Sequence, residues 1–145
     1  RLLGTDGVNK MSKSLNNAIL LKDEADVVKK KVYKLFTDPL HLRIEDPGHL
    51  EGNMVAYYLD SFDPHKEELA QLKKDYQTGG VADITLKNRL VEVINTLLTP
   101  MREERKRLIR DPEFLLSTLK EGSLRGREQV EKTFKEVKEQ IYLKL

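Results

Sequence analysis

The sequence predicts an all-α fold, a helical bundle preceded by a flexible N-terminal loop. Two observations support this prediction. After Asp23 the apolar residues recur every three to four positions, which is the spacing of amphipathic helices. No alternating strand pattern of useful length interrupts that spacing. Apolar residues make up 39% of the chain and charged residues 34%, enough apolar mass for one modest core.

The composition also excludes several classes of protein. The 145 residues fit one domain, or one domain with a small part of another. A net charge of +2 leaves no global electrostatic footprint for nucleic acid, so any RNA contact needs a local basic patch. Without cysteine, neither a disulfide nor a thiolate metal site can form. No apolar run reaches the length of a membrane span. We therefore expect a cytoplasmic protein with neither a membrane nor DNA as a partner.

The N-terminal half is predicted to contain two loops around one helix. Residues 4–17 are rich in Gly, Asn, Ser, Asp and Lys, which favour turns, and we expect residues 5–17 to be loosely held. The first helix is predicted over residues 23–36, with Asp23 as its cap and an end before Pro39. Residues 37–52 then form a long loop, and loops of this length are often functional.

The remaining elements are predicted from their caps and stops. Asn53 caps a short helix, and Asp63-Pro64 opens the next one as cap and first residue. Gly79-Gly80 stops that helix. A long helix follows, which Pro100 is expected to kink because its nitrogen cannot donate a hydrogen bond.

The C-terminal part is expected to hold two further helices. Asp111-Pro112 opens a short helix that ends at Gly122, and Ser123 caps the last one. The prediction is therefore a bundle of five to seven helices.

One segment of the N-terminal loop is suited to phosphate chemistry. In Lys10-Met11-Ser12-Lys13-Ser14, two mobile ammonium groups three residues apart can converge on a polyphosphate. The serine hydroxyls and free backbone amides add hydrogen-bond donors. The alternative interpretation is a solvated basic loop without a ligand.

This five-residue string is identical to the signature of class I aminoacyl-tRNA synthetases. Several further segments resemble the tryptophanyl enzymes, among them Arg43-Ile44-Glu45-Asp46-Pro47-Gly48 and Glu51-Gly52-Asn53-Met54-Val55. The resemblance implies that residues 1–22 end the catalytic Rossmann domain and that residues 23–145 form a helical tRNA anticodon-binding domain. We therefore expect the C-terminal part of a longer ligase.

The resemblance also implies substrates and site residues. ATP, with Mg²⁺ carried by the nucleotide and no protein-bound metal, would bind at Lys10, Met11, Ser12, Lys13 and Ser14. Lys10 and Lys13 would be catalytic, stabilising charge as tryptophan is converted to tryptophanyl-adenylate. The amino acid is then transferred to tRNA(Trp). The tryptophan pocket and a His-Ile-Gly-His-type motif, both on the family's Rossmann half, are missing here, so we expect the chain alone to be inactive. The family implies a homodimer.

Residues for tRNA binding are predicted from basic side chains near the 37–52 loop and on the long helix. Arg102, Arg105, Lys106 and Arg110 fall on one polar face, although Glu103 and Glu104 could make this an ordinary solvated face. The candidates are Arg43, Asn53, Arg102, Arg105 and Lys106.

Other residues are given less specific interpretations. The run Lys29, Lys30, Lys31 and Lys34 is read as a solvated surface. The histidines His41, His49 and His65 lack metal-ligand spacing and are read as surface residues. The tyrosines fall within helical patterns, and most should be buried or half-buried. One near the 37–52 loop could instead stack on an unpaired anticodon base.

Two other hypotheses remain open. One is a helical RNA- or protein-binding module that takes no part in catalysis. The other is a tyrosyl enzyme, which shares the loop but usually continues into a further RNA-binding module.

Overall fold

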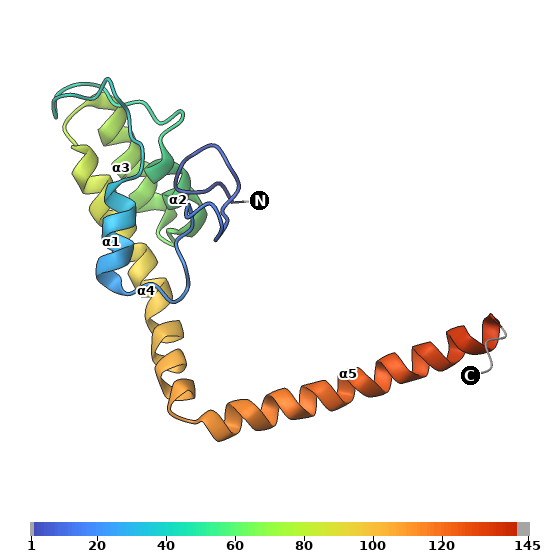
Figure 1. Ribbon diagram of the computed structural model, residues 1–145. Coiled ribbons are helices and arrows are strands. Elements are labelled where there is room, and N and C mark those ends of the chain that lie inside the picture. Colours follow the sequence, from blue (N-terminus) through green and yellow to red (C-terminus); the bar gives the residue numbers. More distant parts are fainter. Residues whose placement is uncertain (1, 142–145) are drawn as a thin grey trace. The chain divides into compact units, whose positions relative to one another are not determined.

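The computed structural model describes residues 2–141, and its regular structure is helical (Figure 1). The described residues contain five α-helices, and their only strand-like pairing is an isolated bridge between Leu3 and Lys10. The predicted all-α fold is confirmed. The chain divides into two compact units, Arg1–Arg102 and Glu103–Leu145. No described helix is long and apolar enough to cross a membrane.

Helix α1 (Ala25–Tyr33) is shorter than the sequence predicted, and Asp23 does not cap it. Its N-cap is Glu24, without a side-chain cap hydrogen bond. The Asp23 carboxylate instead accepts hydrogen bonds from the Leu20 amide at 2.8 Å and from Lys31 Nζ at 2.6 Å. Asp23 therefore closes the turn that leads into the helix.

The caps of α2 (Met54–Phe62) and α3 (Lys66–Thr78) agree only partly with prediction. The Asn53 side chain accepts hydrogen bonds from the amides of Val55 and Ala56, which confirms its cap. Asp63-Pro64 does not open α3, because Asp63 is the C-cap of α2 and its carboxylate binds Arg89. The left-handed backbone of Gly79, at φ 84°, ends α3 as predicted.

Helix α4 (Asp83–Ile109) continues through Pro100 and presents a regular buried stripe to the core. The stripe recurs every four residues through Leu86, Leu90, Ile94 and Leu98. The core of the first unit joins this stripe to side chains from α1, α2 and α3. It comprises Val28, Val32, Leu35, Met54, Val55, Tyr58, Leu59, Leu69, Tyr76, Leu86, Leu90, Ile94 and Leu98.

Helix α5 (Pro112–Gln140) corrects the prediction of two helices. Asp111 caps it as expected, accepting a hydrogen bond from the Phe114 amide at 3.0 Å. Gly122 lies inside the helix, and the Ser123 hydroxyl donates to the Leu119 carbonyl oxygen at 2.8 Å instead of capping a new helix. A mid-helix glycine costs only about 1 kcal/mol, so it does not by itself break a long helix. No α5 side chain is buried within the structure.

Candidate functional site

The base of the N-terminal loop is tied to helix α2. The Tyr58 hydroxyl donates a hydrogen bond to the Leu3 carbonyl oxygen at 2.6 Å, and the Leu3 amide donates to the Tyr57 hydroxyl at 3.3 Å. Burial, with a smaller contribution from Tyr57, raises the pKa of Tyr58 to about 12. The phenol therefore stays protonated and keeps its donor role. The Leu3–Lys10 bridge then brings Lys10 back beside the anchored segment.

Asn17 holds the two arms of the loop together, a role that sequence reasoning missed. Its side chain is buried; the amide oxygen accepts from the Ser12 amide at 2.7 Å, and Nδ2 donates to Asp6 Oδ2 at 2.8 Å and to the Lys10 carbonyl oxygen at 3.2 Å. Gly4 is needed beside it, because a β-carbon there would overlap the Asn17 side chain. The arms are thus cross-linked, whereas the sequence predicted that residues 5–17 would be loosely held.

The Asp6 carboxylate is the second organiser of the loop. Besides Asn17, it accepts hydrogen bonds from the amides of Val8 at 3.1 Å and Asn9 at 3.0 Å. The hydrogen bond from the Asn17 side chain, followed by that from the Val8 amide, lowers the pKa of Asp6 to about 2. Asp6 is therefore ionised at neutral pH, and the negative charge strengthens its bond to Asn17.

The signature residues begin on one of the cross-linked arms, where the Met11 amide donates to the Leu2 carbonyl oxygen at 3.1 Å. Lys10, Lys13 and Ser14 are exposed, and Met11 and Ser12 are half-buried. The hydroxyls of Ser12 and Ser14 are 2.9 Å apart and hydrogen-bonded. Among the ion pairs of residues 2–141, none involves Lys10 or Lys13.

An open pocket adjoins the signature residues. Its volume is about 720 Å³. It is lined by Met11, Ser12, Lys13, Ala18, Ile19, Leu20, Leu21 and Lys22. Two ammonium groups that form no ion pair with residues 2–141, on a loop that carries hydroxyl donors and borders an open pocket, can bind a phosphate chain.

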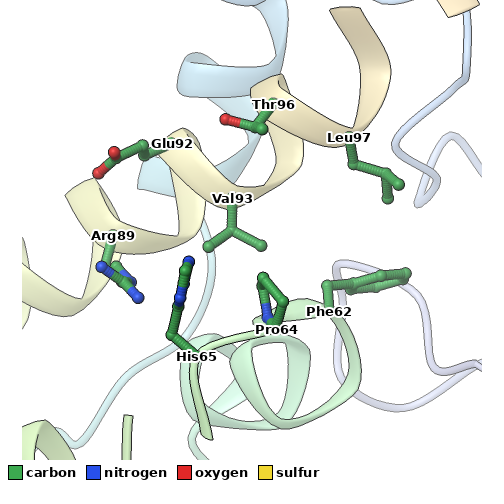
Figure 2. A pocket seen from close by; sticks show the side chains of 8 residues that line it. All are labelled: Phe62, Pro64, His65, Arg89, Glu92, Val93, Thr96 and Leu97. Carbon is green, nitrogen blue, oxygen red and sulfur yellow. The ribbon is translucent and has the colours of Figure 1, made fainter. Parts of the chain in front are cut away.

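A second pocket of about 290 Å³ lies between the α2–α3 junction and α4 (Figure 2). Phe62, Pro64, Val93 and Leu97 make much of its wall apolar. Its basic side chain, Arg89, is already committed, with Nε 2.8 Å from Asp63 Oδ2 and Nη2 3.0 Å from Glu68. The arginine of this pocket is therefore not free to bind a phosphate, and we assign the pocket no ligand.

The structure separates the five tRNA-binding candidates into two groups. Arg43, Arg105 and Lys106 are exposed. Asn53 is buried as the cap of α2. Arg102 is buried as well, donating to the Asp23 carbonyl oxygen at 2.7 Å and to Asn95 Oδ1 at 2.8 Å.

Arg102 consequently does not share an outward face with Arg105, Lys106 and Arg110. It continues the buried four-residue period of Leu98, a signal that the sequence contained. Arg102 Nε and Nη2 and the Asn53 side chain form hydrogen bonds within the chain, so we do not include these two residues among the proposed tRNA contacts.

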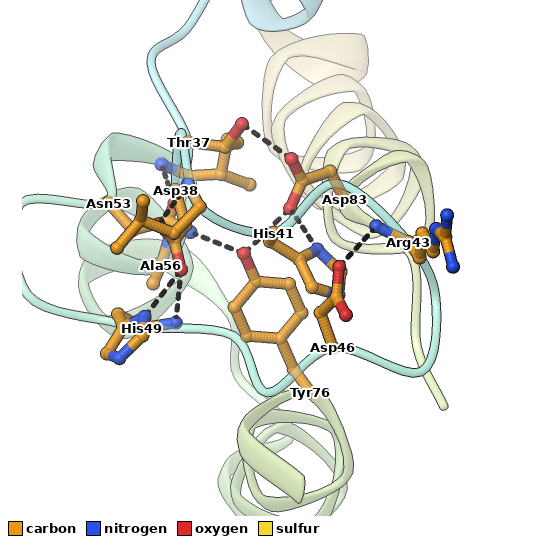
Figure 3. A network of polar contacts seen from close by, with 12 residues as sticks. Thr37, Asp38, His41, Arg43, Asp46, His49, Asn53, Ala56, Tyr76 and Asp83 are labelled. Carbon is orange, nitrogen blue, oxygen red and sulfur yellow. Dashed lines mark hydrogen bonds and ion pairs between the residues drawn. The ribbon is translucent and has the colours of Figure 1, made fainter. Parts of the chain in front are cut away.

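His41 is the histidine whose prediction was wrong. Its side chain is 2% exposed, and Nδ1 lies 3.2 Å from Asp83 Oδ1 (Figure 3). His65 is exposed as expected, and the largely exposed His49 side chain is bonded to Asp38. Of the tyrosines, Tyr58 and Tyr76 are buried, Tyr33 and Tyr57 are half-buried, and Tyr142 lies outside the described residues.

The lysine run on and after α1 is mostly exposed, as expected. Lys29, Lys30 and Lys34 are exposed, and Lys30 pairs with Asp26 at 3.5 Å. Lys31 is half-buried and bonds Asp23 and the Ala18 carbonyl oxygen, so it has a structural position.

A helical domain behind a lysine–serine loop is the arrangement expected for a class I aminoacyl-tRNA synthetase, and comparison with known families agrees. Residues 1–99 match the family model described as tRNA synthetases class I (W and Y). The chain therefore belongs to this family. The predicted resemblance to tryptophanyl enzymes is confirmed by its relatives.

The similar relatives are tryptophan–tRNA ligases. The chain is 48% identical over 141 residues to the enzyme of Clostridium longisporum and 46% identical over 140 residues to that of Streptococcus pneumoniae. These matches cover 97% and 95% of this chain but 41% of each relative, so the chain spans about two-fifths of their length.

Solved structures give the same result. A tryptophanyl-tRNA synthetase from Campylobacter jejuni, complexed with ADP and tryptophan, matches with a TM-score of 0.80 at 28% identity, covering 97% of this chain and 43% of that one. The enzyme from Giardia lamblia matches with a TM-score of 0.61 at 29% identity, covering 68% of this chain and 25% of that one.

Proposed function

We propose that this chain is the C-terminal part of a tryptophan–tRNA ligase. The parent enzyme would activate tryptophan with ATP and transfer the tryptophanyl group to tRNA(Trp). The chain would supply the ATP-phosphate loop and tRNA-binding helices. The observation that carries the proposal is the pair Lys10 and Lys13, exposed and without an ion pair to any described residue, on a loop that is cross-linked by Asn17 and borders an open pocket.

The chemistry that we assign to the loop is electrostatic. A carboxylate oxygen of tryptophan attacks the α-phosphorus of ATP, the bond from that phosphorus to the bridging oxygen breaks, and pyrophosphate leaves. Mg²⁺ carried by the nucleotide would neutralise part of the phosphate charge. Negative charge builds on the leaving group, and the ammonium groups of Lys10 and Lys13 stabilise it. Ser12 and Ser14 add hydrogen bonds, and Met11 lies against the nucleotide.

The attachment of the loop fits this role. Its arms are fixed by Tyr58 and Asn17, while Lys10, Lys13 and Ser14 remain exposed. A loop with a fixed base can carry its cations over a nucleotide when the site closes. We further propose that the exposed Arg43, Arg105 and Lys106 contact the tRNA.

Tryptophan-dependent pyrophosphate exchange tests the proposal. The full-length protein should catalyse exchange with tryptophan and should charge tRNA(Trp). The 145-residue chain alone should not, because proximity and orientation supply much of the rate and a lone loop provides neither. A full-length protein without exchange that still binds tRNA would instead be a non-catalytic RNA-binding module.

Exchange with tyrosine instead of tryptophan would identify a tyrosyl enzyme. That outcome would overturn the proposed specificity for tryptophan. Exchange catalysed by the 145-residue chain alone would overturn its expected inactivity.

A further inference from the structure

We propose that His41 is a positioning residue that fixes the 37–49 loop, so that Leu40, Leu42, Arg43 and Ile44 are presented to unpaired nucleotides of the tRNA. This inference rests on the proposed function and specifies how one of its tRNA-binding surfaces is held.

The Asp83 carboxylate, on the first residue of α4, is the anchor of this loop (Figure 3). Its Oδ1 lies 3.2 Å from His41 Nδ1 and accepts the Tyr76 hydroxyl hydrogen at 2.7 Å, and its Oδ2 accepts from the Thr37 hydroxyl at 2.7 Å. An ionised carboxylate has no proton to donate, so Nδ1 of His41 is the donor in this hydrogen bond. Two loop residues are thereby fastened to one helix end.

Tyr76 forms the support on which the loop is wrapped. Its ring is fully buried and meets the His41 ring edge to face, with centroids 4.7 Å apart. The Gly48 amide donates to the Tyr76 carbonyl oxygen at 2.9 Å, and a β-carbon on Gly48 would overlap the Tyr76 ring. Burial, with the Asp83 hydrogen bond, raises the pKa of Tyr76, so its hydroxyl remains a donor.

The rest of the loop is held by hydrogen bonds to its backbone amide and carbonyl groups. The Gly80 amide donates to the Ile44 carbonyl oxygen at 2.6 Å. The Asp46 carboxylate accepts from the Arg43 amide at 2.8 Å, and Asp38 accepts from the His49 amide at 2.8 Å. The backbone that carries Arg43 is thus fixed on both sides.

Several apolar side chains of this fixed loop are exposed to solvent. Leu40 is 70% exposed, Leu42 is 84% exposed, and Ile44 and Arg43 are also exposed. Apolar side chains beside a planar guanidinium suit the faces of unstacked bases, and the guanidinium can also reach a phosphate. A rigid loop lowers the ordering cost of such contacts.

The environment of His41 indicates a role beyond packing. Its Nε2 atom is buried and forms no hydrogen bond with any described residue. A buried nitrogen without a partner opposes folding, whereas a phenylalanine would fill the space without that cost. The feature that only histidine adds at this position is the Nδ1 hydrogen bond to Asp83. We therefore expect that bond to serve the placement of the loop more than stability.

Three variants of the full-length protein separate positioning from packing. His41→Phe keeps an aromatic ring but loses the bond to Asp83, and it should raise the Kd for a tRNA(Trp) transcript about tenfold. His41→Asn restores a donor at the same distance from the backbone and should recover much of that affinity. His65→Phe, at an exposed histidine outside the network, is the matched control and should bind as the wild type does.

Thermal unfolding of the same variants completes the test. A positioning role predicts that His41→Phe keeps a Tm close to that of the wild type while its affinity for tRNA falls. A lower Tm in His41→Phe together with weaker tRNA binding, with neither restored in His41→Asn, would mean that His41 has a structural role. That result would overturn the inference. Unchanged affinity in His41→Phe would also overturn it and leave the proposed function intact. A wild-type protein that does not bind tRNA(Trp) would refute the proposed function together with the inference.

Discussion

Replacing Asn17 with alanine should release the outer part of the signature loop without unfolding the helices. The Asn17 side chain makes three hydrogen bonds that join the arms of the loop, to the Ser12 amide, to Asp6 and to the Lys10 carbonyl oxygen. The helical core involves other residues. The variant should therefore open locally far more often than the wild-type chain does.

The size of the effect follows from these three contacts. The two bonds to backbone groups are each worth about 0.5–1.5 kcal/mol, and the bond to the Asp6 carboxylate about 1.5–3 kcal/mol. Lys10, Ser12 and Asp6 lie at or near the surface, so water replaces part of what is lost. We expect a net loss of about 2 kcal/mol in the free energy of local opening, or about 30-fold faster amide exchange at Ser12.

Hydrogen exchange measured by NMR tests this directly, with Asn9→Ala as the matched control. Asn9 is exposed, and its side chain makes a single bond to Asp6 at 3.3 Å, so the control should change exchange at Ser12 by less than about threefold. Similar exchange rates in Asn17→Ala and wild type would refute the role that we give to Asn17. Loss of protection throughout the core helices would show that the loop is not an independent unit.

Three further perturbations test other parts of the structure. Because hydrogen bonds lower the folded-state pKa of Asp6 to about 2 from 3.8, its stabilising contribution should persist above pH 4 and be lost as the pH falls toward 2; an NMR titration in which Asn17→Ala leaves that pKa unmoved would contradict the assignment. Arg89→Met leaves the buried Asp63 carboxylate without its ion-pair partner and should lower the free energy of unfolding, measured by thermal unfolding, by about 3–5 kcal/mol. Glu68→Gln removes only the exposed partner of Arg89 and should lower it by at most about 1 kcal/mol. Equal losses in the two variants would count against the importance of the Arg89–Asp63 ion pair. Gly122→Ala should stabilise α5 by about 1 kcal/mol, because the added β-carbon has no atom within 4 Å. If circular dichroism instead showed that the variant loses helicity, the wild-type helix would have to be interrupted at Gly122.

Local signals in the sequence predicted the features that depend on near neighbours. The Asn53 and Asp111 caps and the Gly79 stop each act within a few residues of themselves. The signature loop was also found from its own five residues. By contrast, the continuation of α5 past Gly122 and Ser123 depends on a balance of about 1 kcal/mol across many helical positions, which no single residue decides.

Features that depend on distant partners could not be found in this way. The burial of His41 is set by Asp83, which is 42 positions away, and by the ring of Tyr76. Asn17 resembles any turn-forming asparagine until Asp6 and Gly4 are brought beside it. Arg102 differs, because the sequence already shows that it continues the four-residue spacing of the buried residues of α4. Its charge instead led us to place it on the polar face with the other basic residues.

In the proposed mechanism, Lys13 stabilises the transition state of tryptophan activation. The deciding measurement is single-turnover adenylate formation by Lys13→Ala in the full-length protein, alongside its affinity for ATP. Interactions stronger in the transition state than in the ground state lower the rate and spare ground-state binding. We predict a rate about 100- to 1000-fold lower, with ATP affinity changed less than about tenfold. ATP binding weakened tenfold or more with an unchanged single-turnover rate would contradict the account.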